Sequence, residues 1–260
     1  MKGKKFIYSK KIKTTFKIII IIFFFLLIKL KSFFEKVKYR EKIYKIFESD
    51  SGCNNLTNKY LKNFFTKFTR RSIKWPLPKK IRFKPIMTSK ELIAFCYFMK
   101  PGNIYFEFGA GGSTNIASYY KIKTYSVESD IRWHDKLKSN NIKVNYITID
   151  LKVKSSGYPG KETNINDWKR YIQAYKTEYM ANIILIDGRF RVACALDIFT
   201  KIKNDTIILI HDYTDRINYH IIENYYIKLK TWGRLAAFIK RNDIKYIPKN
   251  IYNKYLYEFL

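Results

Sequence analysis

The sequence predicts an α/β fold, in which a doubly wound and mostly parallel sheet carries helices on both of its faces. Three observations lead to this prediction. Between residues 104 and 210, five short apolar segments of strand length alternate with segments of helical length. Glycine, proline or polar residues separate these segments. Four of the apolar segments are followed directly by an acidic residue or a His-Asp pair, and ligands of such sheets bind where the strands end.

The elements follow one another in an order typical of βαβ units. Thr88 and Glu91 form a capping-box pattern, and Pro101-Gly102 stops the helix that they begin. The predicted elements after it are strand 104–108, helix 113–120, strand 124–127, helix 131–138, strand 144–149, helix 167–179, strand 183–186, helix 192–202 and strand 206–210. A sixth strand toward the edge of the sheet is predicted at residues 233–239, with residues 245–248 as its antiparallel partner.

The chain divides into a basic N-terminus with a hydrophobic helix (1–31), a basic and aromatic linker or helical region (32–85) and the α/β domain (86–260). The apolar run at 18–28 is too short to cross a hydrocarbon core of ~30 Å, but a helix over 14–30 spans it if its flanking lysines reach the interfaces. A cleaved signal peptide and a buried helix are the alternatives. An uncleaved single-pass membrane anchor is favoured, because the run is apolar on all sides and no small-residue cleavage site follows. Lysines flank both of its ends, so the charge pattern assigns no orientation.

The chain carries a formal net charge of +30, from 51 basic and 21 acidic residues. Such an excess is typical of proteins that contact nucleic acid, a membrane surface or an acidic glycan. The lysines are spread along the whole chain, and Ile, Asn, Tyr and Phe are abundant beside them, which is the composition that an AT-biased genome produces. A dedicated nucleic-acid surface is therefore not favoured. The three cysteines have no metal-binding spacing and predict no disulfide framework.

A glycine-rich turn follows the first strand, with the sequence Glu-Phe-Gly-Ala-Gly-Gly-Ser-Thr from Glu107 onward. Gly109 and Gly111 allow a sharp turn and a close approach of the backbone to a ligand. A dinucleotide-binding turn would carry its third glycine where Thr114 stands, which favours a nucleoside without a diphosphate over NAD. The charge of Glu107 would repel a diphosphate and suits a cationic ligand. Glu128, at the end of the second strand, is placed to bind ribose hydroxyls.

This turn resembles the first motif of class I, Rossmann-like S-adenosylmethionine (SAM)-dependent methyltransferases, and Glu128 resembles the ribose-binding acid of that family. The resemblance covers about residues 88–245. It implies SAM as the cofactor, with the turn beside the methionine part, Asp150 near the adenine and Asp187 facing the site of methyl transfer. The residues that it implies in cofactor binding are Glu107, Gly109, Ala110, Gly111, Gly112, Thr114, Glu128, Asp150 and Asp187.

Three further segments, residues 186–196, 210–216 and 233–238, resemble a little-described group of bacterial-type methyltransferase-like proteins with an Asp-Gly-Arg-Phe-Arg motif. The His-Asp and Gly-Arg-Leu elements in these segments are also similar to plant Golgi polysaccharide O-methyltransferases, which are anchored in the membrane by their N-terminus. This second similarity implies a glycan as one class of acceptor.

Methyl transfer from a sulfonium requires alignment of the reacting atoms and, in some reactions, removal of a proton. His211 is the candidate base, because its unperturbed pKa lies near neutrality, and Asp187 or Asp212 is placed to orient it or to hold the acceptor hydroxyl. The alternative for His211 is a structural contact at the strand end. The two carboxylates also resemble part of the metal site of catechol-type methyltransferases, which would hold a divalent cation, but two ligands are too few to define a metal site.

Candidate substrate-binding residues follow the fourth and fifth strands. Arg189 and Arg191 are expected to bind an anionic group such as a uronate or a phosphate, and Tyr213 is expected to line the same site. The alternative for Arg189 is an ion pair with one of the strand-end aspartates. Tyr158 or Trp168, beyond the third strand, is expected to stack on the adenine, with core packing as the alternative.

Together these patterns predict a membrane-tethered SAM-dependent methyltransferase that acts on a hydroxyl or amine of a small molecule or glycan. The alternative is a basic, membrane-associated binding protein that retains the fold without catalysis. An NAD-dependent enzyme is disfavoured by the residue at the third glycine position of the turn.

Overall fold

The computed structural model of the 260-residue chain describes residues 83–140, 142–154 and 157–258. The predicted hydrophobic helix and residues 32–82 of the predicted linker lie outside the described residues, so the membrane anchor stays a prediction. Within the described ranges, no helix combines the length and the apolar character that a bilayer-spanning segment needs.

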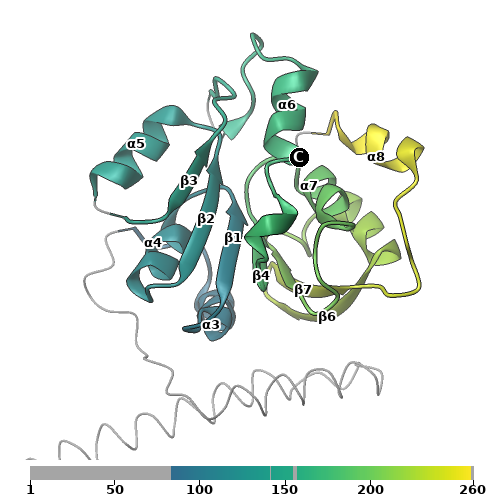
Figure 1. Cartoon of the computed structure of the whole chain (residues 1–260), viewed down its shortest axis with the longest axis horizontal. Coiled ribbons are helices and arrows are strands. Elements are labelled where there is room, and N and C mark those ends of the chain that lie inside the picture. The colour runs from purple at the N-terminus through teal and green to yellow at the C-terminus, as the bar shows by residue number, and fades with distance from the viewer. Residues whose placement is uncertain (1–82, 141, 155–156, 259–260) are drawn as a thin grey trace, which may run out of the picture. The chain divides into compact units, whose positions relative to one another are not determined.

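Seven strands form one sheet in the described domain (Figure 1): β1 (Ile104–Phe108), β2 (Lys123–Glu128), β3 (Asn145–Thr148), β4 (Ile183–Ile186), β5 (Ile207–Ile210), β6 (Tyr226–Trp232) and β7 (Leu235–Lys240). Their order in the sheet is β3-β2-β1-β4-β5-β7-β6. The pairs among β1 to β5 are parallel, whereas β7 runs antiparallel to both β5 and β6. The chain builds the sheet from β1 first toward β3 and then toward the other edge, as predicted for a doubly wound fold.

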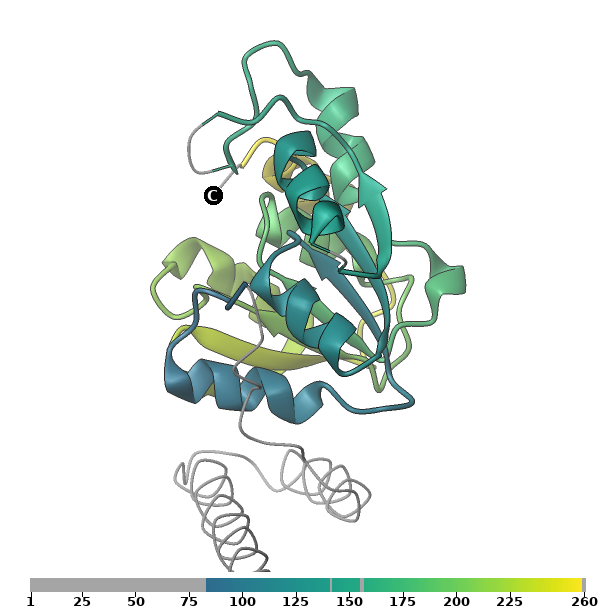
Figure 2. The same ribbon diagram turned by 90° about the vertical axis from the view of Figure 1, so that its left-hand side faces the viewer.

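The helices are α3 (Ser89–Phe98), α4 (Gly112–Tyr119), α5 (Ile131–Ser139), α6 (Ile165–Ile172), α7 (Arg191–Ile198) and α8 (Lys249–Tyr255), with short 3-10 helices η2 (Thr177–Tyr179) and η3 (Ile217–Asn224). α4 and α5 connect the strands on one side of β1, and α6 and α7 connect those on the other side. Because such connections are right-handed, the two pairs of helices lie on opposite faces of the sheet (Figures 1 and 2).

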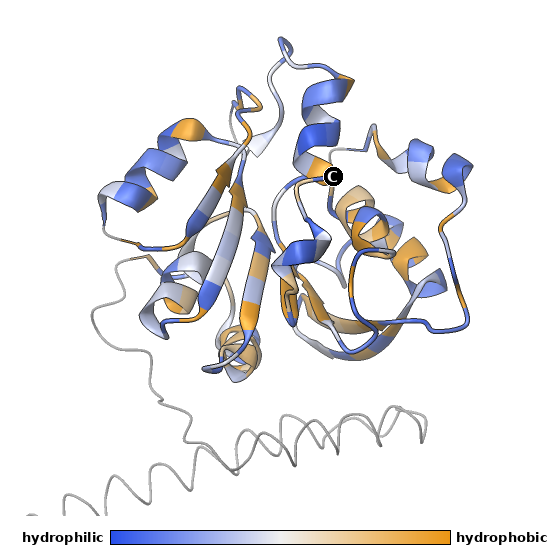
Figure 3. Ribbon diagram, viewed as in Figure 1, coloured by the Kyte–Doolittle hydropathy of each residue, from blue (hydrophilic) through white to orange (hydrophobic). Residues whose placement is uncertain are grey.

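The larger hydrophobic core lies between the sheet and α7. β4 and β5 share the sequence Ile-Ile-Leu-Ile, and every residue of both strands is buried, as expected of central parallel strands. Figure 3 shows hydrophobic residues along α7, in contrast to α5. α5 is amphipathic, and Leu137 is its only buried residue. The strand-end residues therefore follow central strands that are fully buried and packed against α7.

The C-terminal part of the sheet differs from the prediction. The predicted sixth strand exists as β7, but it lies inside the sheet, and its hairpin partner is β6 upstream of it instead of residues 245–248. Gly233, with φ +60, forms the turn between the two strands. The predicted helix 167–179 ends at Ile172, and η2 follows. The register between β6 and β7 shifts between Lys228 and Lys230, which is typical of a β-bulge.

The strand register brings the predicted site residues to one edge of the sheet. Phe108, Ile186 and Ile210 lie side by side on β1, β4 and β5. The residues that follow them, Gly109, Asp187 and His211, therefore also lie next to one another at the carboxyl ends of these strands. In open α/β sheets, ligands bind at this edge.

Candidate functional site

The glycine turn after β1 contacts the turn after β4. Gly109 has a φ of +94°, a left-handed conformation that glycine adopts without strain. A Cβ atom at Gly109 would lie 2.9 Å from Gly188 Cα, so a side chain there would force the two turns apart. Gly109 thus holds the turn next to Asp187, which directly precedes Gly188 in the chain.

Gly111, in contrast, borders open space. A Cβ atom built on Gly111 has no other atom within 4 Å, and its φ of 178° is an extended conformation that any residue adopts. The amide of Gly111 donates a 2.7 Å hydrogen bond to Thr114 Oγ1, which fixes the turn at the start of α4. Gly112, by contrast, packs against the backbone of residues 84–85. The turn is therefore packed against the protein at Gly112 and borders open space at Gly111.

Glu128, at the end of β2, binds this turn directly. Ala110 N–H donates to Glu128 Oε2 at 3.0 Å, and the amides of Ser129 and Asp130 donate to Oε1 at 2.7 and 2.8 Å. Glu128 Oε2 thus retains room for a further hydrogen bond. Burial raises the pKa of Glu128 to about 7, although the backbone amides act in the opposite direction. The turn and the predicted ribose-binding carboxylate are therefore one structural unit.

Glu107 lies beside the turn, as the sequence suggested, but its side chain points into the protein. Its side chain is fully buried, and its two carboxylate oxygens accept hydrogen bonds from four hydroxyl groups: those of Tyr105, Ser113, Thr114 and Ser126. Burial raises the pKa of Glu107, against the effect of these hydrogen bonds. The expectation that Glu107 faces a cationic ligand is corrected, because its oxygens are taken by the protein. Thr114 is likewise buried, so both residues position the turn from within.

The predicted adenine side of the site contains Asp150, Tyr158 and Trp168. Asp150 accepts hydrogen bonds from the amide and the ammonium group of Lys152, at 2.9 and 2.7 Å, and the hydrogen bond from the Lys152 side chain lowers the pKa of Asp150. Trp168 Nε1 donates to Thr163 Oγ1 at 3.1 Å. The Tyr158 ring is partly exposed. Their contact with adenine stays a prediction.

His211, Asp187 and Asp212 come together as predicted. His211 Nδ1 lies 3.1 Å from Asp187 Oδ1 and 3.6 Å from Asp212 Oδ1. Burial alone would lower the pKa of His211, but the hydrogen bond to Asp187 and the charges of both aspartates raise it above its ordinary value. Asp212 has a φ of +55°, in the left-handed region that aspartate adopts more readily than most non-glycine residues.

Glu91 is a member of this cluster that the sequence analysis did not identify. The predicted capping box is present, since Thr88 N–H donates to Glu91 Oε2 at 2.6 Å and Glu91 N–H donates to Thr88 Oγ1 at 3.4 Å. Glu91 Oε1 also accepts a 2.6 Å hydrogen bond from the amide of Arg234, and Oε2 lies 3.6 Å from His211 Nε2. The capping pattern was the only sequence signal at this position, and it does not reveal contacts with such distant residues.

The two arginines of the Asp-Gly-Arg-Phe-Arg motif have different environments. Arg191 is buried, and its guanidinium contacts Asp187 Oδ1 at 3.1 Å and Asp212 Oδ2 at 3.2 Å. It also donates to the carbonyl oxygen of Gly188 at 3.0 Å. The prediction that Arg191 binds substrate is therefore corrected. Arg189 is partly exposed, and its guanidinium lies 4.1 Å from the centre of the Tyr158 ring.

Arg216 and Arg234 also reach Asp212. Arg234 Nη1 donates to Asp212 Oδ1 at 2.7 Å, and Arg216 Nη2 lies 3.9 Å from Asp212 Oδ2. Their side chains are 38% and 34% exposed, in contrast to Asp212 at 17%. Tyr213 is buried, and its hydroxyl donates to Glu223 Oε1 at 2.7 Å, so the prediction that Tyr213 lines the substrate site is corrected.

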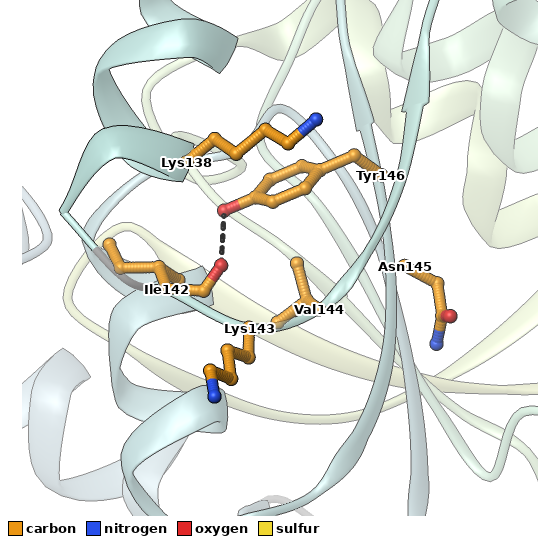
Figure 4. Close-up of a pocket in the computed structure, with 6 residues that line it drawn as sticks. All are labelled: Lys138, Ile142, Lys143, Val144, Asn145 and Tyr146. Atoms are coloured by element: carbon orange, nitrogen blue, oxygen red, sulfur yellow. Dashed lines mark hydrogen bonds between the residues drawn. The ribbon is translucent and has the colours of Figure 1, made fainter.

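Asp187, His211 and Asp212 each offer one ligand atom, and these atoms lie within 4.8 Å of one another. The same carboxylates are already paired with Arg191 and Arg234. A hollow of about 460 Å³ lies elsewhere, between α5 and β3 (Figure 4). Lys138, Lys143 and Tyr146 are among its lining residues, and the Tyr146 hydroxyl donates to the Ile142 carbonyl oxygen at 3.2 Å. This hollow borders the amino end of β3 and therefore lies away from the strand-end cluster.

The fold is shared with a methyltransferase-like protein from Silicibacter pomeroyi DSS-3, with 24% sequence identity and a TM-score of 0.61 over 69% of this chain and 100% of that chain. The MycE methyltransferase of mycinamycin biosynthesis matches with 15% identity and a TM-score of 0.34, over 75% of this chain and 50% of that chain. An RNA methyltransferase from Salinibacter ruber matches with 12% identity and a TM-score of 0.36, over 61% of this chain and 95% of that chain. No protein-family model and no curated protein matches the sequence.

Proposed function

We propose that this chain is a SAM-dependent methyltransferase. The observation that carries the proposal is the 3.0 Å hydrogen bond from Ala110 N–H to Glu128 Oε2, beside the open space in front of Gly111. A nucleoside cofactor needs a backbone cradle and a hydroxyl acceptor at the same place, and these residues supply both. The fold shared with a methyltransferase-like protein is consistent with this class of reaction.

The residues of the turn fit the parts of SAM. In this proposal Glu128 Oε2 accepts a hydrogen bond from a ribose hydroxyl, and the backbone from Gly109 to Gly111 lies beside the methionine part. Asp187, whose turn contacts Gly109, places a carboxylate where the cationic sulfur would be stabilised. When bound, SAM supplies an electrophilic methyl group.

The acceptor in this proposal is a hydroxyl or amine of a small molecule or glycan that carries an anionic group. Arg216 and Arg234 support this, because both guanidinium groups are more exposed than the carboxylate of Asp212 that they contact. They take over the role that the sequence suggested for Arg191. Membrane tethering by residues 14–30 remains part of the proposal, supported by the apolar run in the sequence.

We further propose that the strand-end cluster works without a divalent cation. Arg191 is paired with Asp187 and Asp212, and Arg234 with Asp212, so a cation would have to displace these guanidinium groups. Calorimetric titration of the full chain with magnesium and manganese chloride tests this point. Saturable binding that is lost in Asp212→Asn would contradict it.

The cofactor is tested by calorimetric titration of the full chain with SAM, S-adenosylhomocysteine and NAD. We expect saturable binding of the first two and none of NAD. Gly111→Val places a side chain in the open space, so we expect about tenfold or greater loss of SAM affinity, equivalent to ~1.4 kcal/mol, with an unchanged melting temperature. Ser118→Val adds a similar side chain farther along α4 and serves as the control. Equal SAM affinity in both variants would contradict the proposal.

The alternative is a non-catalytic, basic binding protein at a membrane, which the charge of +30 favours. Such a protein would bind vesicles containing anionic lipids and lose them steeply as salt is raised. Binding of these vesicles with no binding of SAM or S-adenosylhomocysteine would favour this alternative.

A further inference from the structure

The His211 ring lies between two carboxylates, one at each nitrogen. Asp187 Oδ1 is 3.1 Å from Nδ1, and Glu91 Oε2 is 3.6 Å from Nε2. Nε2 is buried and makes no hydrogen bond with any of the described residues. The Glu91 side chain is fully buried, and that of His211 is 5% exposed. Water therefore has little access to the nitrogen that faces Glu91.

Neither neutral tautomer of His211 suits this arrangement. A proton on Nδ1 alone leaves the lone pair of Nε2 facing the Glu91 carboxylate, and a proton on Nε2 alone leaves the lone pair of Nδ1 facing Asp187. Only the imidazolium, with a proton on each nitrogen, presents a donor to both acids. The buried Glu91 carboxylate has Arg234 Nε 3.8 Å from its Oε1, and the imidazolium adds a positive charge at Oε2, which no guanidinium among the described residues contacts.

Asp187 is the most exposed of the three acidic side chains around His211, which are Glu91, Asp187 and Asp212. Its side chain is 29% exposed. Its contacts with His211 Nδ1 and with Arg191 Nη2 are both made by Oδ1. Among the residues that the structure describes, no hydrogen bond to Asp187 Oδ2 is found, so this oxygen retains its lone pairs.

We infer that Glu91 and Asp187 hold His211 as an imidazolium, that Glu91 is the positioning residue for this ring, and that Asp187 Oδ2 is the base offered to the acceptor. This inference rests on the proposed methyltransferase function. It gives the proton-accepting role to Asp187, where the sequence suggested His211.

The proton balance of the step is simple. The acceptor oxygen or nitrogen forms a bond to the methyl carbon as the carbon–sulfur bond breaks, and sulfur keeps the electron pair. The proton of the acceptor passes to Asp187 Oδ2. The imidazolium of His211, bound to Oδ1 of the same carboxylate, remains protonated throughout. Proton release to solvent then restores the site.

The other charges near His211 agree with this assignment. The groups that face it or its partners from the surrounding elements are Glu91 on α3, Asp187 after β4, Asp212 after β5, Arg191 on α7, Arg216 before η3 and Arg234 before β7. The pKa of His211 is raised, because the contacts with Asp187 and Asp212 outweigh burial and the charge of Arg191. The buried Glu91 has a lowered pKa, since the amides of Arg234 and Thr88 outweigh its desolvation.

Nitrogen-15 NMR of histidine-labelled full chain tests the inference, with His211→Asn to assign the signals. At neutral pH we expect both ring nitrogens of His211 to be protonated in the wild type. In Glu91→Gln we expect the titration midpoint of His211 to fall by about one pH unit, equivalent to a tenfold change in proton affinity. Glu91→Asp keeps the charge and should restore part of this shift.

Thr88→Ala is the matched control, because it removes the hydrogen bond to Glu91 N–H and weakens the start of α3 without removing either carboxylate. We expect a lower melting temperature and an unchanged His211 titration. A neutral His211 in the wild type, or equal His211 titrations in wild type and Glu91→Gln, would overturn the inference. Coordination of added magnesium by His211 would overturn it as well. Calorimetry with SAM on the same samples tests the proposed function separately. If only the binding of SAM is absent, the proposed function fails, and the protonation of His211 is a separate result.

Discussion

Ala110 and Glu128 are joined by a 3.0 Å hydrogen bond between a backbone amide and a buried carboxylate, across 18 residues of sequence. This bond ties the turn after β1 to the end of β2. Burial raises the pKa of Glu128 to about 7, so the carboxylate is only partly ionised near neutral pH. The stability of the site and its affinity for a ribose should therefore depend on pH.

The first prediction concerns stability. The pKa of Glu128 is about 7 in the folded chain, above its ordinary value of 4.5, so ionisation of Glu128 lowers stability as pH rises through this window. The loss in the free energy of unfolding is complete above the pKa that Glu128 has in the folded chain, and it is on the order of 3 kcal/mol. Glu128→Gln lacks this titration. We expect its free energy of unfolding, relative to the wild type, to rise by this order between about pH 4 and about pH 8, measured by urea denaturation. A constant difference would contradict the predicted pKa.

The second prediction separates two glycines of one turn. Gly109→Ala introduces a Cβ atom 2.9 Å from Gly188 at a φ of +94°, so we expect a loss of about 2 kcal/mol or more in the free energy of unfolding. Gly111→Ala meets no neighbouring atom and an extended backbone, so its effect should stay within about 0.5 kcal/mol. Thermal and urea unfolding of the two variants measure this difference. Equal losses would mean that the turns after β1 and β4 are not packed as described.

The third prediction compares the two arginines of the Asp-Gly-Arg-Phe-Arg motif. Arg191→Met leaves the partly buried Asp187 and Asp212 without their shared guanidinium, and we expect it to cost about 3 kcal/mol or more. Arg189→Met is a change of the same chemistry, and loss of the stacking on Tyr158 should cost no more than about 1 kcal/mol. Denaturant unfolding of both variants provides the comparison. A larger loss in Arg189→Met would reverse the roles assigned to the two side chains.

The fourth prediction concerns the anionic group of the acceptor. Arg234 directly precedes β7 and Arg241 directly follows it, so they lie at opposite ends of one strand, and each is paired with an aspartate. Arg234→Gln should weaken binding of inorganic phosphate by about tenfold, as loss of a charge-assisted hydrogen bond predicts. Arg241→Gln should leave it unchanged. Calorimetric titrations with phosphate, and with acetate as a carboxylate, measure the affinity of both variants. Equal affinities of Arg234→Gln and Arg241→Gln for these anions would exclude Arg234 as the anion-binding residue.

Much of the fold was predictable, because buried parallel strands and amphipathic helices have different periodicities. β4 and β5 are continuous apolar runs, and residues at the ends of adjacent parallel strands must lie close together. This is why Asp187, His211 and Asp212 could be grouped from the sequence. β6 was missed, because Lys228 and Lys230 interrupt its apolar pattern.

The roles of individual side chains in the site could not be inferred from their spacing in the sequence. Arg189 and Arg191 are two residues apart, and the left-handed conformation of Phe190 between them, with φ +55°, decides which of them begins α7 and turns inward. Glu91 lies 143 residues before Arg234, whose amide it binds, and a local capping pattern carries no information on that contact. The burial of Glu107 follows from hydroxyl groups on α4 and β2, which only the folded chain brings together.

The register shift in β6 has a consequence for the chain in a crowded solution. β6 is the last strand at its side of the sheet, and its outer backbone groups would otherwise form a template for a strand of another molecule. The shift between Lys228 and Lys230 interrupts the regular ladder of this strand, so the edge is a poorer template for pairing. We therefore expect the irregularity in β6 to disfavour edge-to-edge pairing with the sheet of another molecule.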